Sequence, residues 1–200
     1  GAGAITLKTG SVGKLQLNNS ANDFSGGVTI QSGGNLSVTG GSYLGTGNLT
    51  INNGAAIQTL TGGSLNVGGT QSWTGDFATV IGGGGLDMGT TAVNLNGGIR
   101  TVTVNNGTTG VRTTTVGGII SNGGLAVLAT GTGAAKTSLI LTGANAYADG
   151  STVNANATLA TSTTGTFGTG DVTVADTGKL TLGNATSFFD SAKLTFASTS

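Results

Sequence analysis

The sequence predicts an all-β fold, a parallel β-helix (β-solenoid) of about 8–10 coils. Three observations predict it: a composition poor in helix formers, large apolar residues spaced two apart, and frequent turn signals between them. Gly (40), Thr (37), Asn (17) and Ser (16) supply 110 of the 200 residues, and Glu, Pro, His and Cys are absent. A helical bundle is therefore excluded, and backbone hydrogen bonds with stacked apolar side chains must hold the fold together.

Fourteen pairs of large apolar residues, each flanking one other residue, mark the expected strands in chain order. The pairs are Ile5/Leu7, Leu15/Leu17, Val28/Ile30, Leu36/Val38, Leu49/Ile51, Leu65/Val67, Leu86/Met88, Val93/Leu95, Val102/Val104, Leu125/Val127, Leu139/Leu141, Val172/Val174, Leu180/Leu182 and Leu194/Phe196. Each pair predicts a strand of about five residues with one buried face. The turn signals between them include Asn53-Gly54, Asn96-Gly97, Asn106-Gly107, Asn122-Gly123 and Asp149-Gly150.

Short strands with frequent turns fit a sandwich, a barrel or a solenoid, and side-chain bulk decides between them. Sandwich cores need large anchors, whereas this chain has nine aromatic residues and only two inward apolar residues per strand. That supply fits a narrow stack in which each strand pairs with its equivalent one coil away, ~4.8 Å along the axis. At roughly 20–25 residues per coil, the rod is expected to be ~40–50 Å long.

An internal repeat supports the solenoid. An offset of 123 residues aligns Phe24 through Ile57 with Tyr147 through Leu180 without a gap, and seven of these 34 positions are identical. Residues 1–200 are expected to form a single solenoid, with repeat-like parts at 14–60 and 138–182 and irregular spacer coils at 64–130. Within the spacer, Arg100 lies on the same side as Val102 and Val104. Either it lies at a corner where its head reaches water, or its strand enters the coil late.

The residues of both repeats resemble a known family. LILTGANAYADGSTVNANATLA followed by FGTGDVTVADTGKLTLG is similar to the autotransporter-associated β-strand repeat of bacterial type V secretion passengers, and so is KLQLNNSANDFSGGVTIQSGGNLSV followed by LGTGNLTINNGAAIQTL. The resemblance implies a right-handed β-helix on the bacterial exterior, without catalytic residues in the repeat. Ala148 and Asp149 depart from the family pattern, because they replace the expected Ser/Thr-Gly beside Tyr147.

Charge excludes several classes of partner. The net charge is zero and only 7% of residues are charged, so no basic stripe exists for nucleic acid or for an anionic membrane surface. No apolar run reaches the ~20 residues of a membrane-spanning helix, so no membrane insertion is expected within this segment. We expect an extracellular or bacterial cell-surface location, with the export signal outside this segment.

No catalytic, cofactor-binding or metal-binding residues, and no cofactor, are predicted. Asp171 and Asp176 are candidates for an acid–base pair, but five residues apart they face opposite sides of a straight strand, so we interpret them as solvated corner residues. Gly82 through Thr90 partly match a calcium-binding nonapeptide. The match fails at Gly89, where a large apolar residue is required, so a tight turn is expected.

Aromatic side chains could stack on sugars if they lined one face of the rod. The candidates are Phe24, Tyr43, Trp73, Phe77, Tyr147, Phe167, Phe188, Phe189 and Phe196. Phe24 and Tyr147 occupy equivalent positions in the two repeats, beside a corner, which favours a structural role for both. Most of the nine are therefore expected to fill corners or the interior.

The sequence favours a non-enzymatic extracellular structural β-solenoid, acting as a stalk, an adhesin, or a fibre or surface-layer element. The expected partners are other copies or neighbouring coils end to end, because uncapped coils expose unpaired backbone groups; the chain is then a segment of a longer polypeptide or a self-stacking unit. A polysaccharide-binding or polysaccharide-degrading β-helix is the alternative, with surface glycans as partners. A third reading, an ice- or mineral-binding surface, needs regularly spaced outward threonines.

Overall fold

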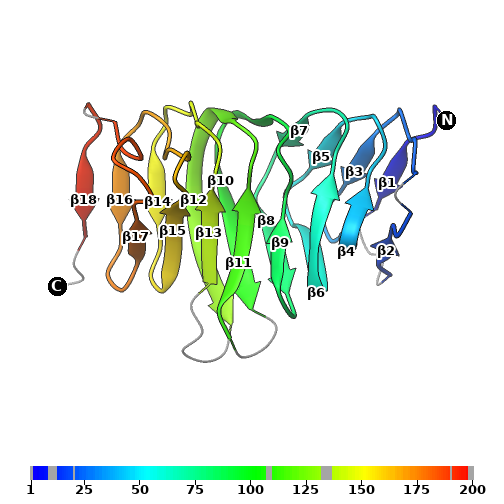
Figure 1. The fold of residues 1–200 in the computed structure, drawn as a ribbon, viewed down its shortest axis with the longest axis horizontal. Coiled ribbons are helices and arrows are strands. Elements are labelled where there is room, and N and C mark those ends of the chain that lie inside the picture. The colour runs from blue at the N-terminus through cyan, green and yellow to red at the C-terminus, as the bar shows by residue number, and fades with distance from the viewer. Residues whose placement is uncertain are drawn as a thin grey trace.

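The computed structural model describes residues 2–8, 13–19, 21–106, 110–131, 137–189 and 191–197, and these residues form a β-solenoid (Figure 1). Their eighteen strands all pair in parallel, in about eight turns, and no helix occurs among them. The predicted fold class is confirmed, and the number of turns falls at the lower end of the expected range. Of the predicted turns, Asn106-Gly107 is described only at Asn106, because Gly107 lies outside these ranges.

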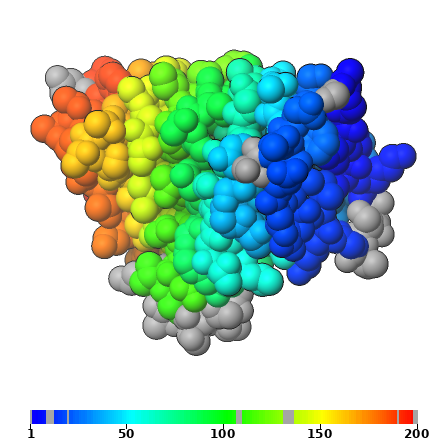
Figure 2. Space-filling model, turned by 45° about the vertical axis from the view of Figure 1, so that its right-hand side comes forward, coloured from blue at the N-terminus to red at the C-terminus, as the bar shows by residue number. Residues whose placement is uncertain are grey.

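The strands follow one another along the rod in chain order. They are β1 (Ile5–Leu7), β2 (Leu15–Gln16), β3 (Val28–Ile30), β4 (Asn35–Tyr43), β5 (Leu49–Ile51), β6 (Ala55–Asn66), β7 (Gln71–Trp73), β8 (Phe77–Ile81), β9 (Gly85–Asp87), β10 (Val93–Asn106), β11 (Arg112–Val116), β12 (Ile120–Gly131), β13 (Thr137–Leu141), β14 (Ser151–Val153), β15 (Ala157–Thr161), β16 (Val172–Val174), β17 (Lys179–Thr181) and β18 (Leu194–Phe196). The N-terminal and C-terminal strands therefore lie at opposite ends of the rod (Figures 1 and 2).

Each coil has three sides, defined by three columns of parallel pairings. The first side contains β1, β3, β5, β7 and the beginnings of β10 and β12. The second contains β2, the first halves of β4 and β6, β8, the rest of β10 and β12, then β14, β16 and β18. The third contains the second halves of β4 and β6, then β9, β11, β13, β15 and β17. Equivalent residues on neighbouring coils are separated by 20 to 28 positions, as in the register steps Thr137 to Ala157 and Gly85 to Thr113.

The interior is a stack of the predicted apolar pairs. Strands such as β3, β5 and β16 alternate between two buried residues and one half-buried residue, so each contributes two side chains to the core. In register, Val28 and Leu49 lie one above the other, and so do Ile30 and Ile51. Cohesion comes from this repetition along the axis, since each buried side chain covers the one before it.

Two expectations about the strands need correction. Half of the strands have three residues rather than five, while β4, β6, β10 and β12 run around a corner and reach 9 to 14 residues. The predicted one-sided burial is also wrong for the last two pairs, since Leu182 is 55% exposed and Phe196 is 69% exposed. No described coil beyond β17 and β18 covers them.

Five strands have no predicted apolar pair: β7, β8, β11, β14 and β15. Their inward positions include polar residues that find partners inside the stack. Gln71 Nε2 donates to the Met88 carbonyl oxygen at 2.6 Å, and the hydroxyls of Thr79 and Thr114 meet at 2.7 Å. An inward polar side chain is tolerated when it is hydrogen-bonded. A strand with such a residue lacks the apolar pair by which the other strands were predicted.

Arg100 lies where β10 passes from the first side to the second. The pairing of β10 with β12 shifts in register between Asn94 and Gly98, just before it. The half-buried Arg100 Nε donates to the carbonyl oxygens of Trp73 at 3.0 Å and Leu95 at 2.9 Å. Of the two expectations for Arg100, the corner position is confirmed, and its side chain supplies donors to carbonyls that the register shift leaves unpaired in the ladder.

The 123-residue repeat is also a structural repeat. The amide of Thr46 donates to the Phe24 carbonyl oxygen at 3.1 Å, and the amide of Thr169 donates to the Tyr147 oxygen at 2.9 Å. Yet β3 lies on the first side of the rod and its counterpart β14 on the second. The second repeat therefore begins five coils and one further side after the first.

The fluorescence of Trp73 should report on whether the stack is folded. Its side chain is fully buried, and its ring packs edge-on against that of Phe77 with the ring centroids 4.9 Å apart. Its Nε1 donates to Gln71 Oε1 at 3.3 Å. We expect blue-shifted fluorescence emission and weak quenching by acrylamide in the native state, with both reversed in denaturant, because the indole is shielded from water. Emission near the free-tryptophan wavelength in native buffer would contradict this placement.

Candidate functional site

The two candidate acid–base carboxylates lie on either side of β16, both exposed. Asp171 Oδ1 accepts from the Lys193 amide at 2.8 Å, and Asp176 Oδ1 accepts from the Thr177 amide at 3.0 Å. Each carboxylate is thus engaged with the backbone at a turn, which agrees with the interpretation as corner residues. Across the described ranges, no group of three Asp, Glu, His or Cys residues could hold a metal ion.

The glycine-rich segment at Gly82 through Thr90 contains strand β9 (Gly85–Asp87), and the strand ends in a turn at Gly89. Asp87 Oδ1 accepts from the Gly89 amide at 2.8 Å, and Gly89 has a φ of 83°. An aspartate that binds the amide two residues on makes an Asx turn, and glycine adopts the positive φ without strain. The expected tight turn is confirmed.

The nine aromatic residues divide into an interior set and a surface set. Trp73, Phe77, Tyr147 and Phe167 are buried. Phe24 and Phe188 are half-buried, and Tyr43, Phe189 and Phe196 are exposed. The equivalent positions Phe24 and Tyr147 differ in burial. Both nevertheless lie against a glycine of the next coil: Gly45 covers Phe24 and Gly168 covers Tyr147, each so closely that a Cβ on the glycine would not fit. Their shared position beside a corner supports the structural role expected for both.

Burial raises the pKa of the Tyr147 phenol. The hydrogen bond between the Tyr147 and Ser151 hydroxyls, at 2.7 Å, lowers the pKa by a smaller amount. Below the unfolded-state pKa of about 10, the phenol is neutral in both states and contributes no pH dependence. Above it, the unfolded state ionises while the folded state does not, so stability falls as the pH rises. We expect denaturant midpoints to drop between about pH 10 and pH 11.5, and less steeply in Tyr147→Phe. Parallel curves for the two proteins would contradict this.

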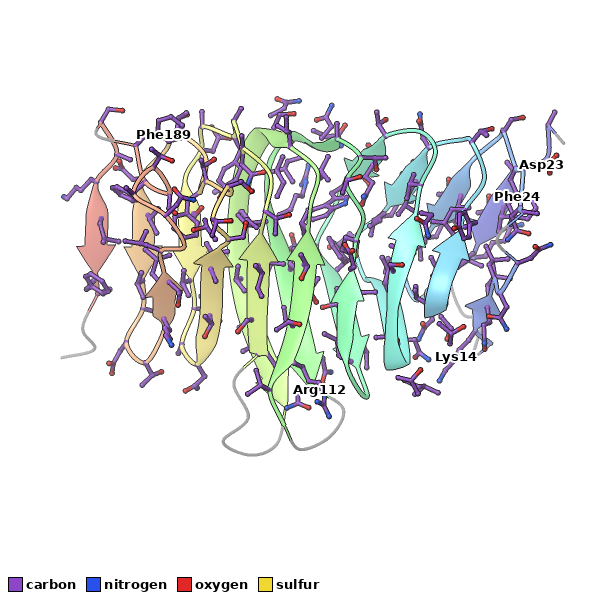
Figure 3. The ribbon with its side chains drawn as sticks, in the orientation of Figure 1. Lys14, Asp23, Phe24, Arg112 and Phe189 are labelled. Atoms are coloured by element: carbon purple, nitrogen blue, oxygen red, sulfur yellow. The ribbon has the colours of Figure 1, made fainter. Side chains whose placement is uncertain are left out.

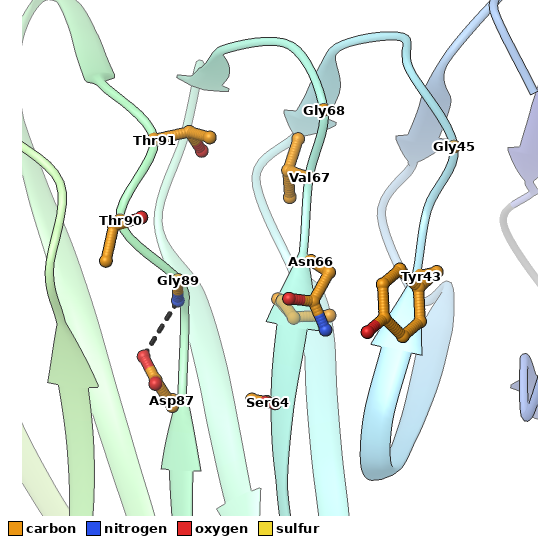
Figure 4. A pocket seen from close by; sticks show the side chains of 11 residues that line it. Tyr43, Gly45, Ser64, Asn66, Val67, Gly68, Asp87, Gly89, Thr90 and Thr91 are labelled. Atoms are coloured by element: carbon orange, nitrogen blue, oxygen red, sulfur yellow. Dashed lines mark hydrogen bonds between the residues drawn. The ribbon is translucent and has the colours of Figure 1, made fainter. Parts of the chain in front are cut away.

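A surface hollow of about 370 Å³ lies where the third side meets the first, and we call it the Tyr43 hollow (Figure 4). It spans three successive coils, which contribute residues following or ending β4, β6 and β9. Its lining residues are Tyr43, Gly45, Ser64, Leu65, Asn66, Val67, Gly68, Asp87, Gly89, Thr90 and Thr91. Neither Lys nor Arg is among them.

Register places the polar side chains of the hollow in two outward rows. Gly41, Ser64 and Asp87 are partners on consecutive coils, and Tyr43 is the partner of Asn66. In each strand the neighbouring inward residue is buried, so these side chains face solvent. Figure 4 shows the Tyr43 ring at one end of the hollow, Asn66 next to it, and Asp87 on the far coil.

Comparison with known families, with curated proteins and with solved structures gives no match for this chain. No helix long and apolar enough to cross a membrane occurs among the residues that the structure describes. The fold and the surface chemistry therefore carry the functional argument.

Sequence reasoning named parts of the Tyr43 hollow without bringing them together. Tyr43 was among the aromatic candidates, and Asp87 belonged to the glycine-rich segment. Asn66 and Ser64 had no assigned role. An offset of 23 residues aligns Gly41, Ser64 and Asp87, and this was the available signal. Neighbouring coils differ in length, so that offset could be selected only once the register was known.

Proposed function

We propose that this chain is a non-enzymatic structural β-solenoid of a bacterial cell surface, serving as a stalk, an adhesin or a fibre element. The observation that carries the proposal is the parallel register maintained through about eight turns around a closely filled interior. Such a stack is stiff along its axis and offers long polar sides. The resemblance to the autotransporter-associated repeat supports a right-handed passenger on the exterior, and surface proteolysis of intact cells expressing the native gene tests the location. A chain that is cleaved only after lysis would contradict it.

End-to-end contact is the partner that we propose. The rungs of β17 and β18 pair on one face only within the described residues, and they present Leu182, Leu194 and Phe196 to solvent. At the other end, Ile5 and Leu7 are half-buried on a rung paired with β3 alone. A further coil, from the same polypeptide or from another copy, would pair these edges and cover these side chains.

Sedimentation velocity over a range of concentrations tests whether copies stack. Phe196→Asp is expected to shift the association to at least tenfold higher concentration, because it places a charge in the end contact. The matched control is Leu60→Asp, since Leu60 is 63% exposed on an interior coil, where end-to-end contact does not reach. A monomer at all concentrations, or equal effects of the two variants, would refute stacking between copies.

A further inference from the structure

We infer that the Tyr43 hollow binds a neutral polysaccharide, with one or two sugar rings lying along the rod axis across three coils. The hollow measures about 370 Å³ and combines one exposed aromatic ring with a carboxylate, an amide and hydroxyl groups. Tyr43 and Asp87 lie two coils apart, roughly 10 Å along the axis. That length and volume suit a short stretch of sugar rings.

Tyr43 supplies the apolar platform. Its side chain is 37% exposed, while its backbone is held on both sides. Its carbonyl oxygen accepts from Asn22 Nδ2 at 3.0 Å, and the next amide, of Leu44, donates to the Asn66 oxygen at 2.9 Å. A phenol ring on a fixed backbone presents a flat apolar face at little entropic cost, and the C–H face of a sugar ring is a suitable partner.

The polar groups of the hollow have free hydrogen-bonding capacity toward a ligand. Asp87 uses Oδ1 to bind the Gly89 amide, and its Oδ2 has no protein partner in the described part of the chain. The Asn66 side-chain amide likewise makes no hydrogen bond there, and Ser64 Oγ makes only a long one, at 3.4 Å, to the Gly40 oxygen. A carboxylate oxygen that accepts, beside an amide that both donates and accepts, matches the adjacent hydroxyls of a sugar.

Charge selects a neutral ligand over an acidic one. Among the described residues that line the hollow, Asp87 is the one carboxylate, and none is a Lys or Arg that could neutralise an anion. A uronic acid or a sulfated sugar would place a second negative charge near Asp87 without compensation, which disfavours binding. A neutral polysaccharide incurs no such repulsion.

Two glycines leave the floor of the hollow without side chains. A Cβ at Gly68 would lie 2.6 Å from the Gly45 oxygen, and one at Gly89 would lie 2.6 Å from the Leu65 oxygen. Stacking of the coils therefore requires glycine at both positions, and the surface above them consists of bare backbone. A ligand can approach such a floor closely. Because Tyr43, Ser64, Asn66 and Asp87 all belong to strands, the hollow is formed before the ligand arrives.

The test measures binding of three neutral oligosaccharides, cellohexaose, maltohexaose and mannohexaose, to the 200-residue chain. Saturation-transfer NMR detects weak binding and calorimetry gives the affinity. We expect at least one of the three to bind, and Tyr43→Ala to weaken its affinity at least tenfold. Asn66→Ala and Asp87→Asn are each expected to weaken it severalfold. Polygalacturonate, the acidic probe, is expected to bind more weakly than the best neutral probe.

Phe189→Ala is the matched control. Phe189 is 39% exposed, nearly the same as Tyr43, and lies near the opposite end of the rod (Figure 3). Its removal should leave the affinity unchanged, with circular dichroism confirming that every variant keeps its β-structure. The inference is overturned if none of the neutral probes binds, if binding survives Tyr43→Ala, if Phe189→Ala reduces it equally, or if polygalacturonate binds more tightly. None of these outcomes affects the proposed rod, which the sedimentation and proteolysis experiments test separately.

Discussion

Replacing Gly118 with alanine is expected to lower the free energy of unfolding by about 3 kcal/mol. The backbone at Gly118 is outside the left-handed region, so the effect comes from space alone. An added Cβ would overlap the carbonyl oxygen of Thr91 on the preceding coil. Neither segment can retreat easily, because the Val93 amide donates to the Ile119 oxygen at 2.9 Å immediately beside the contact. Denaturant unfolding followed by Trp73 fluorescence measures the loss.

Gly13→Ala is the control for this substitution. A Cβ at Gly13 would meet no atom of the described residues within 4 Å, and its φ is also outside the left-handed region. We expect its free energy of unfolding to match that of the parent chain, or to rise by a few tenths of a kcal/mol through a less flexible unfolded state. Equal stability of Gly118→Ala and Gly13→Ala would show that the coils do not approach closely enough at Gly118 to exclude a Cβ.

Asn145→Ala is expected to cost about 3 kcal/mol, because it leaves two buried backbone groups without partners. Asn145 joins three coils. Its Oδ1 accepts from the Ile120 amide at 2.8 Å, and its Nδ2 donates to the Thr166 oxygen at 2.7 Å. The side chain is buried, so water cannot replace these bonds without entering the stack. The same unfolding experiment gives the magnitude.

The repeat supplies a matched comparison at Asn22, which lies 123 residues before Asn145. Asn22 Nδ2 donates to the Tyr43 oxygen at 3.0 Å, the counterpart of the bond from Asn145 to Thr166, but the Asn22 side chain is only half-buried. Asn22→Ala should therefore cost about 1 kcal/mol or less, since water reaches the freed carbonyl. If both variants lost the same stability, burial would not be the cause of the larger effect.

The fold was predictable because period-two alternation and glycine-rich corners leave a clear pattern in the sequence. All fourteen apolar pairs fall in or directly beside strands. The strands without a predicted apolar pair have inward residues such as Gln71 and Thr114, whose hydrogen-bond partners lie on other coils. A single strand does not reveal such a partner, so a polar inward position resembles a loop until the register is known.

The Tyr43 hollow was less predictable for a related reason. Tyr43 and Asp87 are 44 positions apart, and they become neighbours only because two coils of particular lengths separate them. Coil lengths vary along the chain, and the irregular coil between Val93 and Ile120 contains a register shift. The residue types were visible in the sequence, but their assembly into one surface depends on where each corner falls.

The displacement of the 123-residue repeat by one side has a consequence for how the rod meets its surroundings. Equivalent outer surfaces of the two repeats therefore face different sides of the rod, since one of its three sides separates them. In a longer array with the same spacing, successive repeats would face successive sides of the rod, so that equivalent motifs would follow a helical path around its axis. A partner that recognises one such motif would then find it from any direction of approach, whatever the rotation of the rod about its anchor.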